Sequence, residues 1–244
     1  MGAQYSVFVN AGAVVLLSSA LLEQERQDVL NSVLFAQLVA NKKYPEFTLG
    51  DGWYDTCQGV LKDSWLQRAV AWDSFGTDAE SKRAMVQWVE SRLEDQAGNI
   101  TIAGIAGVFN DIAQLPCNHP ATELLREQMS RQKNIEVSGT PAEAVSDVRL
   151  QIIVVGQGAV MSSLFIEFET NVHTLTDPLG HLFSSDNVLG NIRLRWFQAN
   201  LSSVLYVSLR DAIVKKLGDK AAKNILYISD IKPVGLPSTA GAPS

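Results

Sequence analysis

The spacing of apolar residues changes along this chain, and that change limits its fold more than any other feature. Before residue 134, apolar residues recur at three- and four-residue steps, which is typical of helices buried along one face. From Asn134 onward they alternate with polar residues, which is typical of half-buried strands. No internal repeat divides the sequence. Helices followed by antiparallel strands in one chain indicate a single domain of the α+β class.

The first part of the chain predicts a short strand near Ser6–Val9 and then five helices. The longest helix is capped by Ser18 or Ser19 and runs to about Lys43. A second helix is capped by Asp51 and is followed by an extended segment, 65–72. A third helix follows the capping box Thr77–Glu80 and buries Met85, Trp88, Val89 and Leu93. A fourth helix, over 100–115, is rich in small residues. A fifth helix begins at Pro120 and carries Leu124, Leu125 and Met129.

The later part of the chain predicts a β-hairpin with its turn at Gly156-Gln157-Gly158. Val148, Leu150, Ile152 and Val154 share one face, and Leu164, Ile166 and Phe168 alternate against Phe165, Glu167 and Glu169. Near the turn the strands are apolar on both faces, which we interpret as a tip buried under helices. The alternative is a tip that penetrates lipid. The candidate membrane-active residues are Ile152, Ile153, Val154, Val155, Val160, Met161, Leu164 and Phe165.

After the hairpin, the sequence predicts a turn, a strand, a helix and a last strand. The turn is 177–180 and the strand is 192–197. The helix is capped by Asn200, ends at Gly218 and has Val204, Leu205, Leu209, Ala212, Ile213 and Leu217 inward. The last strand is 224–228, and the Pro-, Gly- and Ser-containing end is expected to be mobile. We therefore expect one domain over residues 1–232 and a flexible tail over 233–244.

Composition and charge exclude some classes of function. Apolar residues make up 46% and charged residues 19%, so the chain is not largely disordered. A net charge of −6 opposes nucleic acid binding, because phosphate contacts depend on cationic side chains. Between Arg193 and Lys223 the balance reverses, with seven cationic residues against two acidic ones. This run is interpreted as a solvated helix face, with a patch for anionic lipid as the alternative.

Targeting signals are sparse. No run approaches the roughly 20 apolar residues that a membrane-spanning helix requires. No Lys or Arg precedes Arg26, which argues against a signal peptide. The opening Met1-Gly2-Ala3-Gln4-Tyr5-Ser6 matches the short N-myristoylation pattern. We expect synthesis in the cytoplasm, release without a classical signal peptide, and a peripheral location on the target membrane.

The sequence contains no recognisable catalytic or phosphate-binding motif, so we expect neither an enzyme nor a required metal or cofactor. His173, Asp177 and His181 share one polar loop and could supply three zinc ligands or an acid–base pair. Loop histidines are commonly only solvated or hydrogen-bonded, and there is no candidate for a fourth ligand, so we favour that interpretation. Cys57 lies on the apolar stripe of its helix and is interpreted as a small hydrophobe, with a buried acyl-cysteine as the alternative. Cys117 lies between Pro116 and Asn118, where it is expected to be more accessible.

One long string carries a family resemblance. The sequence from Val29 to Tyr44, VLNSVLFAQLVANKKY, followed by Trp53-Tyr54, Val60-Leu61 and Trp65, resembles a bacterial family related to the Erwinia virulence factor Evf. The later segment 207–218, VSLRDAIVKKLG, also looks familial. That family is similar to the Cyt cytolytic toxins and to fungal volvatoxin. The resemblance implies a three-layer fold in which helical hairpins wrap an antiparallel sheet.

The resemblance also implies an action on lipid membranes and a fatty acid on a buried cysteine, for which it does not choose between Cys57 and Cys117. We therefore expect a lipid- or membrane-interacting, toxin-like bacterial virulence protein that becomes cytolytic after a helical layer moves. The alternative is a non-lytic module that binds a fatty acid or a partner protein. The expected partners are a lipid membrane or a fatty acid, with homo-oligomers forming on membranes.

Overall fold

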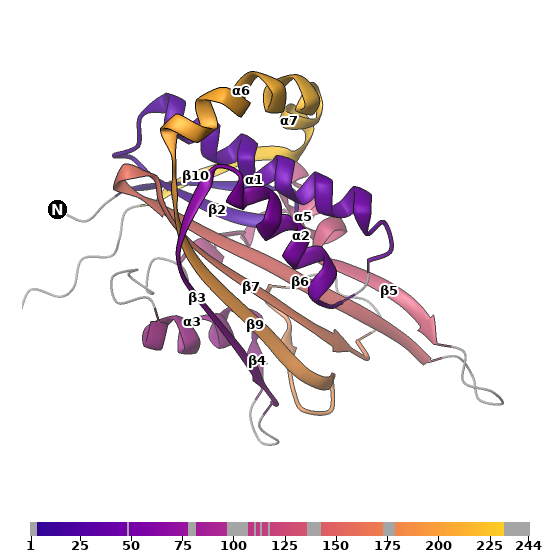
Figure 1. Ribbon diagram of the computed structural model, residues 1–244. Coiled ribbons are helices and arrows are strands. Elements are labelled where there is room, and N and C mark those ends of the chain that lie inside the picture. Colours follow the sequence, from indigo (N-terminus) through magenta and orange to yellow (C-terminus); the bar gives the residue numbers. More distant parts are fainter. Residues whose placement is uncertain are drawn as a thin grey trace, which may run out of the picture.

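A central β-sheet with helices on both faces gives the molecule three layers (Figure 1). The computed structural model describes residues 4–47, 49–77, 82–96, 107–109, 111–112, 114–116, 118–135, 143–172 and 179–231. The expected α+β class, with a mainly antiparallel sheet wrapped by helices, is confirmed.

Eight strands of the described residues form the main sheet. They are β1 (Tyr5–Asn10), β2 (Ala13–Ser18), β3 (Trp65–Phe75), β5 (Ser130–Ile135), β6 (Glu143–Gly156), β7 (Val160–Thr170), β9 (Val188–Leu201) and β10 (Ile225–Ile231). Their order is β10-β1-β2-β6-β7-β9-β3, and β5 pairs with the first part of β6. Neighbouring strands are antiparallel except β2 and β6, which are parallel. Two short strands, β4 (Arg83–Ala84) and β8 (Leu182–Phe183), pair separately.

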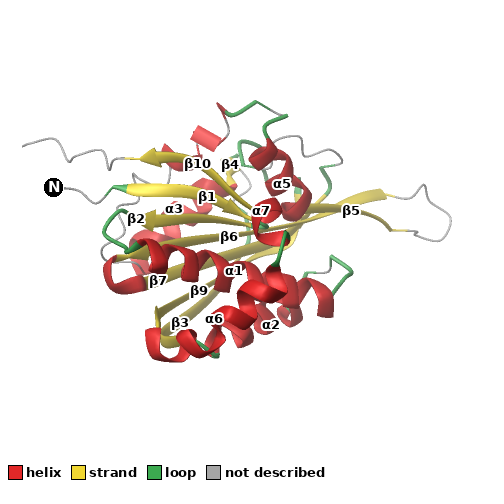
Figure 2. Ribbon diagram, turned by 90° about the horizontal axis from the view of Figure 1, so that it is seen from above, coloured by secondary structure: helices red, strands yellow, loops and turns green. Residues whose placement is uncertain are grey.

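The helices divide between the two faces of the sheet (Figure 2). One face is covered by α1 (Glu23–Lys43) and α2 (Asp51–Lys62), and the other by α3 (Met85–Gln96) and α5 (Pro120–Met129). The helix α6 (Ser203–Leu217) packs mainly on α1, with Leu201 and Ile225 at the ends of two strands beside it, and the short α7 (Lys220–Asn224) follows it. In Figure 1, α6 therefore lies outside the α1–α2 layer.

Two apolar cores form because the side chains of each strand alternate between the faces. Val148, Leu150 and Ile152 belong to the core under α3 and α5. Ile153 and Val155, from the same strand, belong to the core under α1 and α2. Both faces of β6 near its end are therefore buried, and burial of each such side chain contributes about 1.5–3 kcal/mol to folding.

Several predicted helix starts were wrong by a few residues. The strand β2, which the sequence did not predict, continues to Ser18, so α1 begins only at Glu23. The side chain of Glu25 accepts a hydrogen bond from the Leu22 backbone N–H at 2.9 Å, which satisfies this donor at the start of the helix. Asp51 is the first residue of α2 and follows the cap position, which Gly50 occupies. Its carboxylate instead pairs with a side chain of β9.

The predicted start and inward face of α6 were also partly wrong. Asn200 belongs to β9, and the side chain of Ser202 caps α6 by accepting from the Leu205 backbone N–H at 3.3 Å. Val204 is 81% exposed and Leu205 41% exposed, although both were predicted to point inward. The physical reason is that α6 packs against one helix, so only a narrow stripe of it is covered.

Other elements were shifted or not predicted. The hairpin turn lies at Gln157–Ala159, one residue later than expected, and the strand predicted at 192–197 extends to the limits of β9. The strand predicted at 224–228 begins one residue later, because Asn224 ends α7, and β10 continues to Ile231. The elements β5 and α7 were not predicted. The residues 78–80 of the predicted capping box, most of the predicted helix 100–115 and the predicted tail 233–244 lie outside the described residues.

Candidate functional site

The candidate membrane-active residues all lie on the hairpin formed by β6 and β7. These strands pair without interruption from Ser146 opposite Thr170 to Gly156 opposite Val160. Seven of the eight candidates are buried, and only Val160 is half-buried. At the turn, Gln157 and Gly158 are exposed, and the φ angle of 71° at Gly158 favours glycine there. The hairpin is therefore covered to its tip, as the buried-tip interpretation requires.

The two faces of this hairpin differ in polarity. The face under α3 and α5 is apolar over most of its length; its buried side chains are Val148, Leu150, Ile152, Val154, Leu164, Ile166 and Phe168. The face under α1 and α2 is apolar only near the tip. Farther from the tip, this face carries Gln151 and Ser163, whose side chains form a hydrogen bond of 3.0 Å. Beyond that pair, Arg149 lies opposite Glu167. The part of the hairpin away from its tip is thus amphipathic.

Aromatic side chains hold the helices against the hairpin. On one face, the rings of Trp53 and Tyr54 from α2 lie 5.6 and 5.1 Å from the ring of Phe165, measured between centroids. On the other face, Trp88 from α3 lies 5.5 Å from Phe168. Such aromatic pairs contribute about 0.5–1.5 kcal/mol each beyond area burial. Moving either helical layer would therefore break these aromatic contacts and expose the apolar core beneath that layer.

A row of charged side chains crosses β5, β6, β7 and β9 on the α1–α2 face, where the apolar part of that face ends. We call it the charged belt, and it comprises Lys133, Asp147, Arg149, Glu167, Glu169, Arg193 and Arg195. At one end of it, the Nζ atom of Lys133 lies 2.7 Å from Asp147 Oδ1 and 2.6 Å from Glu169 Oε1. The belt therefore pairs its charges across neighbouring strands.

The most buried acid of the belt near α2 is Glu167, whose side chain is 2% exposed. Its Oε1 atom lies 3.2 Å from Arg193 Nε and 3.6 Å from an Arg195 nitrogen. Its Oε2 atom accepts a hydrogen bond from the Gly50 backbone N–H at 3.2 Å. Burial nevertheless raises the pKa of Glu167 above its usual value, although these partners act in the opposite direction.

The guanidinium of Arg149 is enclosed by aromatic rings. It lies 3.9 Å from the centroid of Phe47 and 4.3 Å from that of Trp53, and it donates a hydrogen bond to Asn41 Oδ1 at 3.2 Å. Burial lowers the pKa of Arg149 to about 10, so it remains a cation at neutral pH. A buried cation stacked on two rings is an anchor for the start of α2.

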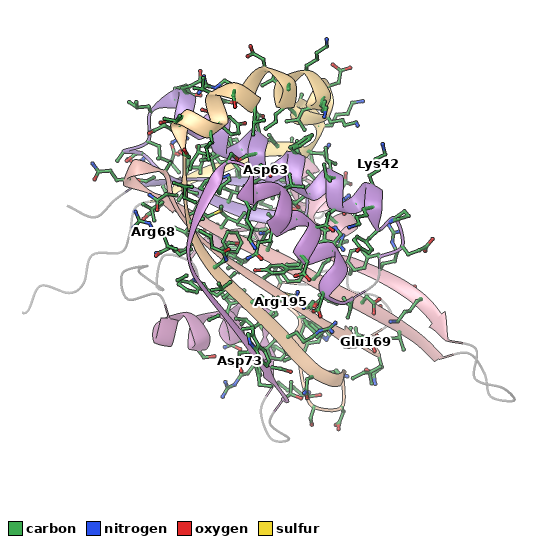
Figure 3. The ribbon with its side chains drawn as sticks, in the orientation of Figure 1. Lys42, Asp63, Arg68, Asp73, Glu169 and Arg195 are labelled. Atoms are coloured by element: carbon green, nitrogen blue, oxygen red, sulfur yellow. The ribbon has the colours of Figure 1, made fainter. Side chains whose placement is uncertain are left out.

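A cleft of about 540 Å³ opens beside the belt, between the start of α2 and the strands β3 and β9. It is lined by Asp51, Asp55, Trp72, Asp73, Ser74, Arg193, Leu194 and Arg195. The side chain of Arg195 pairs with Asp51 and lies 4.8 Å from the ring of Tyr54, and Figure 3 shows it beneath α2. Trp72 is 80% exposed, which leaves a large apolar side chain at the rim.

The outer surface of α6 carries exposed apolar side chains that we call the valine stripe: Val204, Val207 and Val214. They are 81%, 58% and 48% exposed. Arg210 lies one helical turn from both Val207 and Val214, and it holds α6 to α1 by donating to both carboxylate oxygens of Asp28 at 2.9 and 2.7 Å. The valine stripe is therefore open to solvent, beside the packed face of α6 that carries Tyr206, Ile213 and Leu217.

The start of α6 lies next to the hairpin tip. Val160, at the tip, pairs with Asn200 near the end of β9, and α6 begins at Ser203. At the other end of α6, Lys215 and Lys216 occupy the last turn, where cations favour the helix dipole. The valine stripe, lysines and apolar hairpin tip therefore belong to adjoining elements, as Figure 1 shows.

The structure describes Cys57 but not Cys117. Cys57 lies in α2 and is 3% exposed within the core under α1 and α2. Burial raises the pKa of its thiol to about 12, so the thiol is protonated and a poor nucleophile at neutral pH. Cys117 lies outside the described residues. Acylation of either cysteine stays a prediction.

The proposed histidine loop receives no geometric support. His173 and Asp177 lie outside the described residues. His181 is half-buried, and its ring packs 4.6 Å from that of Phe183, between centroids. Within the part of the chain that the structure describes, no group of three or more His, Cys, Asp or Glu residues could hold a metal ion.

Sequence reasoning located the hairpin but missed the charged belt and the valine stripe. Glu167 and Glu169 alternate with apolar neighbours, and so do Arg193 and Arg195. Pairing these two strands would have placed the charges side by side, but the pairing itself could not be read from the sequence. For the valine stripe the only signal was that α6 has apolar residues on too much of its circumference for one packed face.

No family model matches this sequence, and no curated protein sequence matches it. Solved structures of similar fold include the following two. One is titled delta-endotoxin, with a TM-score of 0.45 and 11% identity over 79% of this chain and 82% of that one. The other is the activated Cyt2Ba monomer from Bacillus thuringiensis subsp. israelensis, with a TM-score of 0.45 and 9% identity over 79% of this chain and 98% of that one.

A similarity at this level carries no argument about function. The expected likeness to Cyt toxins thus has a counterpart among solved structures, whereas membership of the Evf-related family stays a prediction. Among the described helices, none is both long and apolar enough to cross a bilayer.

Proposed function

We propose that this protein binds lipid membranes from solution through α6 and then exposes its β6–β7 hairpin to the lipid. The observation that carries the proposal is the valine stripe on the outermost helix. Transfer of apolar side chains from water to a bilayer interface is favourable by about 25 cal/mol per Å². An exposed apolar stripe on a helix that ends in lysines has the composition of a membrane-surface helix.

Charge supports an anionic lipid surface as the target. Five cationic residues lie between Arg210 and Lys223, against Asp211 and Asp219. The chain as a whole carries −6, so this end of the molecule is set apart from the rest. Each lysine near an anionic membrane contributes about 1 kcal/mol to binding, and salt weakens the effect.

The position of α6 links docking to exposure of the hairpin. Because α6 begins beside Val160, docking of the valine stripe brings the hairpin tip to the lipid surface. The hairpin face under α3 and α5 is apolar over most of its length, so displacement of that helical layer would present this face to lipid. The charged belt would remain on the opposite face. Insertion of this apolar face into a target membrane would make the protein cytolytic.

The proposal is tested with vesicles that release a trapped dye. We expect binding and release with vesicles that contain phosphatidylglycerol, and weaker effects with phosphatidylcholine alone or at high salt. A double variant, Lys215→Gln with Lys216→Gln, should lose most of the preference for anionic vesicles. The matched control is Lys62→Gln with Lys82→Gln, which removes the same charge from residues outside α6. Absence of binding to every vesicle composition would refute the proposal.

A non-lytic binding module is the second candidate. It is favoured by the cleft beside the charged belt, where Arg193 and Arg195 lie near the exposed Trp72. Arginine pairs well with a carboxylate, and the tryptophan offers an apolar surface, so a fatty acid or an acidic partner segment would suit this chemistry. Native mass spectrometry of the purified protein separates the candidates. A retained acyl mass, together with no dye release, would favour the binding module.

A further inference from the structure

We propose that two copies of this protein associate in solution by pairing their β3 strands antiparallel, so that one continuous sheet crosses a two-fold axis. The inference does not depend on membrane binding. It rests on an edge strand that has an open hydrogen-bonding side, exposed apolar side chains and a self-complementary sequence.

The first observation is that β3 is the last strand of the sheet. It spans eleven residues and pairs only with β9 among the described strands. The backbone groups on its other side point away from the sheet, and such a row is a ready template for another strand. In Figure 1, β3 follows the edge of the sheet.

The second observation is the exposure of apolar side chains on this edge. Trp72 is 80% exposed and Val70 is 62% exposed. They are two residues apart, so both lie on the α1–α2 face, opposite Arg195 and Phe197 of β9. Exposed tryptophan is uncommon on a monomer, and tryptophan is enriched among residues that dominate protein interfaces.

The third observation is that β3 carries little protection against edge pairing. Natural edge strands are commonly guarded by lysine, proline or inward-pointing charges. The segment 69–75 contains no Lys, Arg or His, no proline and no glycine, and its one charged residue is Asp73. The irregularity in β3 lies before this segment, between Gln67 and Ala69. The part that carries Val70 and Trp72 is therefore regular.

The sequence of β3 favours an antiparallel partner with the same sequence. A two-fold axis at Ala71 places Val70 of each copy opposite Trp72 of the other, on the same face of the sheet. The result is two equivalent apolar pairs. Arg68 and Asp73 lie toward opposite ends of β3, as Figure 3 shows, so antiparallel pairing brings the cation of one copy near the anion of the other. A parallel arrangement would instead place like charges together.

This register is preferable to those with an axis at Asp73 or at Val70. An axis at Asp73 would place two carboxylates opposite each other, which is unfavourable. An axis at Val70 would place Arg68 opposite Trp72 and leave only one valine pair. The axis at Ala71 avoids opposed like charges and covers both large apolar side chains in each copy. The interface is isologous, so it closes on itself as a dimer and does not propagate.

The test is sedimentation of the full chain without lipid, from low to high micromolar concentration. We expect a monomer–dimer equilibrium, and Trp72→Lys should weaken it by more than about tenfold. The matched control is Tyr227→Lys, which changes an exposed aromatic side chain on the opposite edge strand β10. A monomer at every concentration would overturn the inference, and so would equal weakening by the two variants.

Cysteine cross-linking tests the register. In a Cys117→Ser background, Ala71→Cys should form a disulfide between copies, because residues opposite each other in an antiparallel pair have Cα atoms about 4.5–5.5 Å apart. Ala69→Cys is the control, since it lies on the same face but about 13 Å from its own copy in this register. Cross-linking of Ala69→Cys in preference to Ala71→Cys would contradict the proposed axis. Failure here would leave membrane binding by α6 unaffected.

Discussion

Removing part of the valine stripe should weaken membrane binding without changing the fold. The perturbation is the double variant Val207→Ser with Val214→Ser. These residues are 58% and 48% exposed, so neither supports the core to any large extent. Serine and valine have similar helix propensities, and we expect the free energy of unfolding to change by no more than about 0.5 kcal/mol.

The size of the binding effect follows from the exposed area. Complete burial of a valine side chain is worth about 1.5 kcal/mol or more. About half of each of these two side chains is available, which gives about 1.5 kcal/mol for the pair. Desolvation of the two introduced hydroxyls adds about 0.5 kcal/mol or more. We therefore expect a loss of about 2 kcal/mol, which corresponds to about a 30-fold weaker partition into anionic vesicles.

The assay is co-sedimentation with vesicles across a lipid titration, with thermal unfolding of each variant as the check on folding. The control variant is Leu182→Ser with Leu189→Ser, which removes exposed apolar side chains, 50% and 37% exposed, from other elements. We expect this control to bind like the parent protein. If the α6 variant bound within about threefold of the parent, or if both variants lost binding equally, the valine stripe would not be the docking surface.

Three further predictions concern the layers around the hairpin. Burial raises the pKa of Glu167 above 4.5, so its charge disfavours the folded state at neutral pH, and Glu167→Gln should be neutral or stabilising at pH 7. As the pH falls through the raised pKa toward 4.5, the parent protein should gain stability relative to this variant, which urea unfolding measures. Arg149→Ala should lower the free energy of unfolding by about 3 kcal/mol, because the contacts with Phe47 and Trp53 are lost. Arg149→Met should lower it by less than half as much, and equal losses in the two variants would show that packing is not the cause. Cys57 should react with a maleimide only as fast as the protein opens, and rapid labelling of the native state would contradict its burial.

The class of the fold was predictable because the hairpin strands show their alternation directly. Val148 to Val154 and Leu164 to Phe168 are long, regular and bounded by a glycine turn, so their pairing followed from local rules. The strand β2 was missed because Ala13–Ser18 is buried on both faces and does not alternate. Its parallel pairing with β6 joins segments far apart in sequence, and no local signal specifies it.

The surfaces that support function were harder to predict than the core. A helix that packs on another helix leaves apolar residues outside. The sequence of α6 correctly predicted that Ile213 is buried, but it did not tell that Val204 would be exposed. The charged belt depends on which strands lie side by side, because Glu167 meets Arg193 only through the register of β7 and β9. Such features require tertiary structure, whereas the apolar hairpin required only alternation.

The most direct test of the membrane account follows the hairpin tip. Gln157 is exposed at the turn, so Gln157→Cys in a Cys117→Ser background accepts an environment-sensitive fluorophore. The control position is Asp186, an exposed residue near the opposite end of the hairpin. With anionic vesicles, we expect a blue shift and quenching by lipid-borne quenchers at position 157 and neither at position 186. Vesicle binding with the probe at 157 still in water would contradict delivery of the hairpin into lipid.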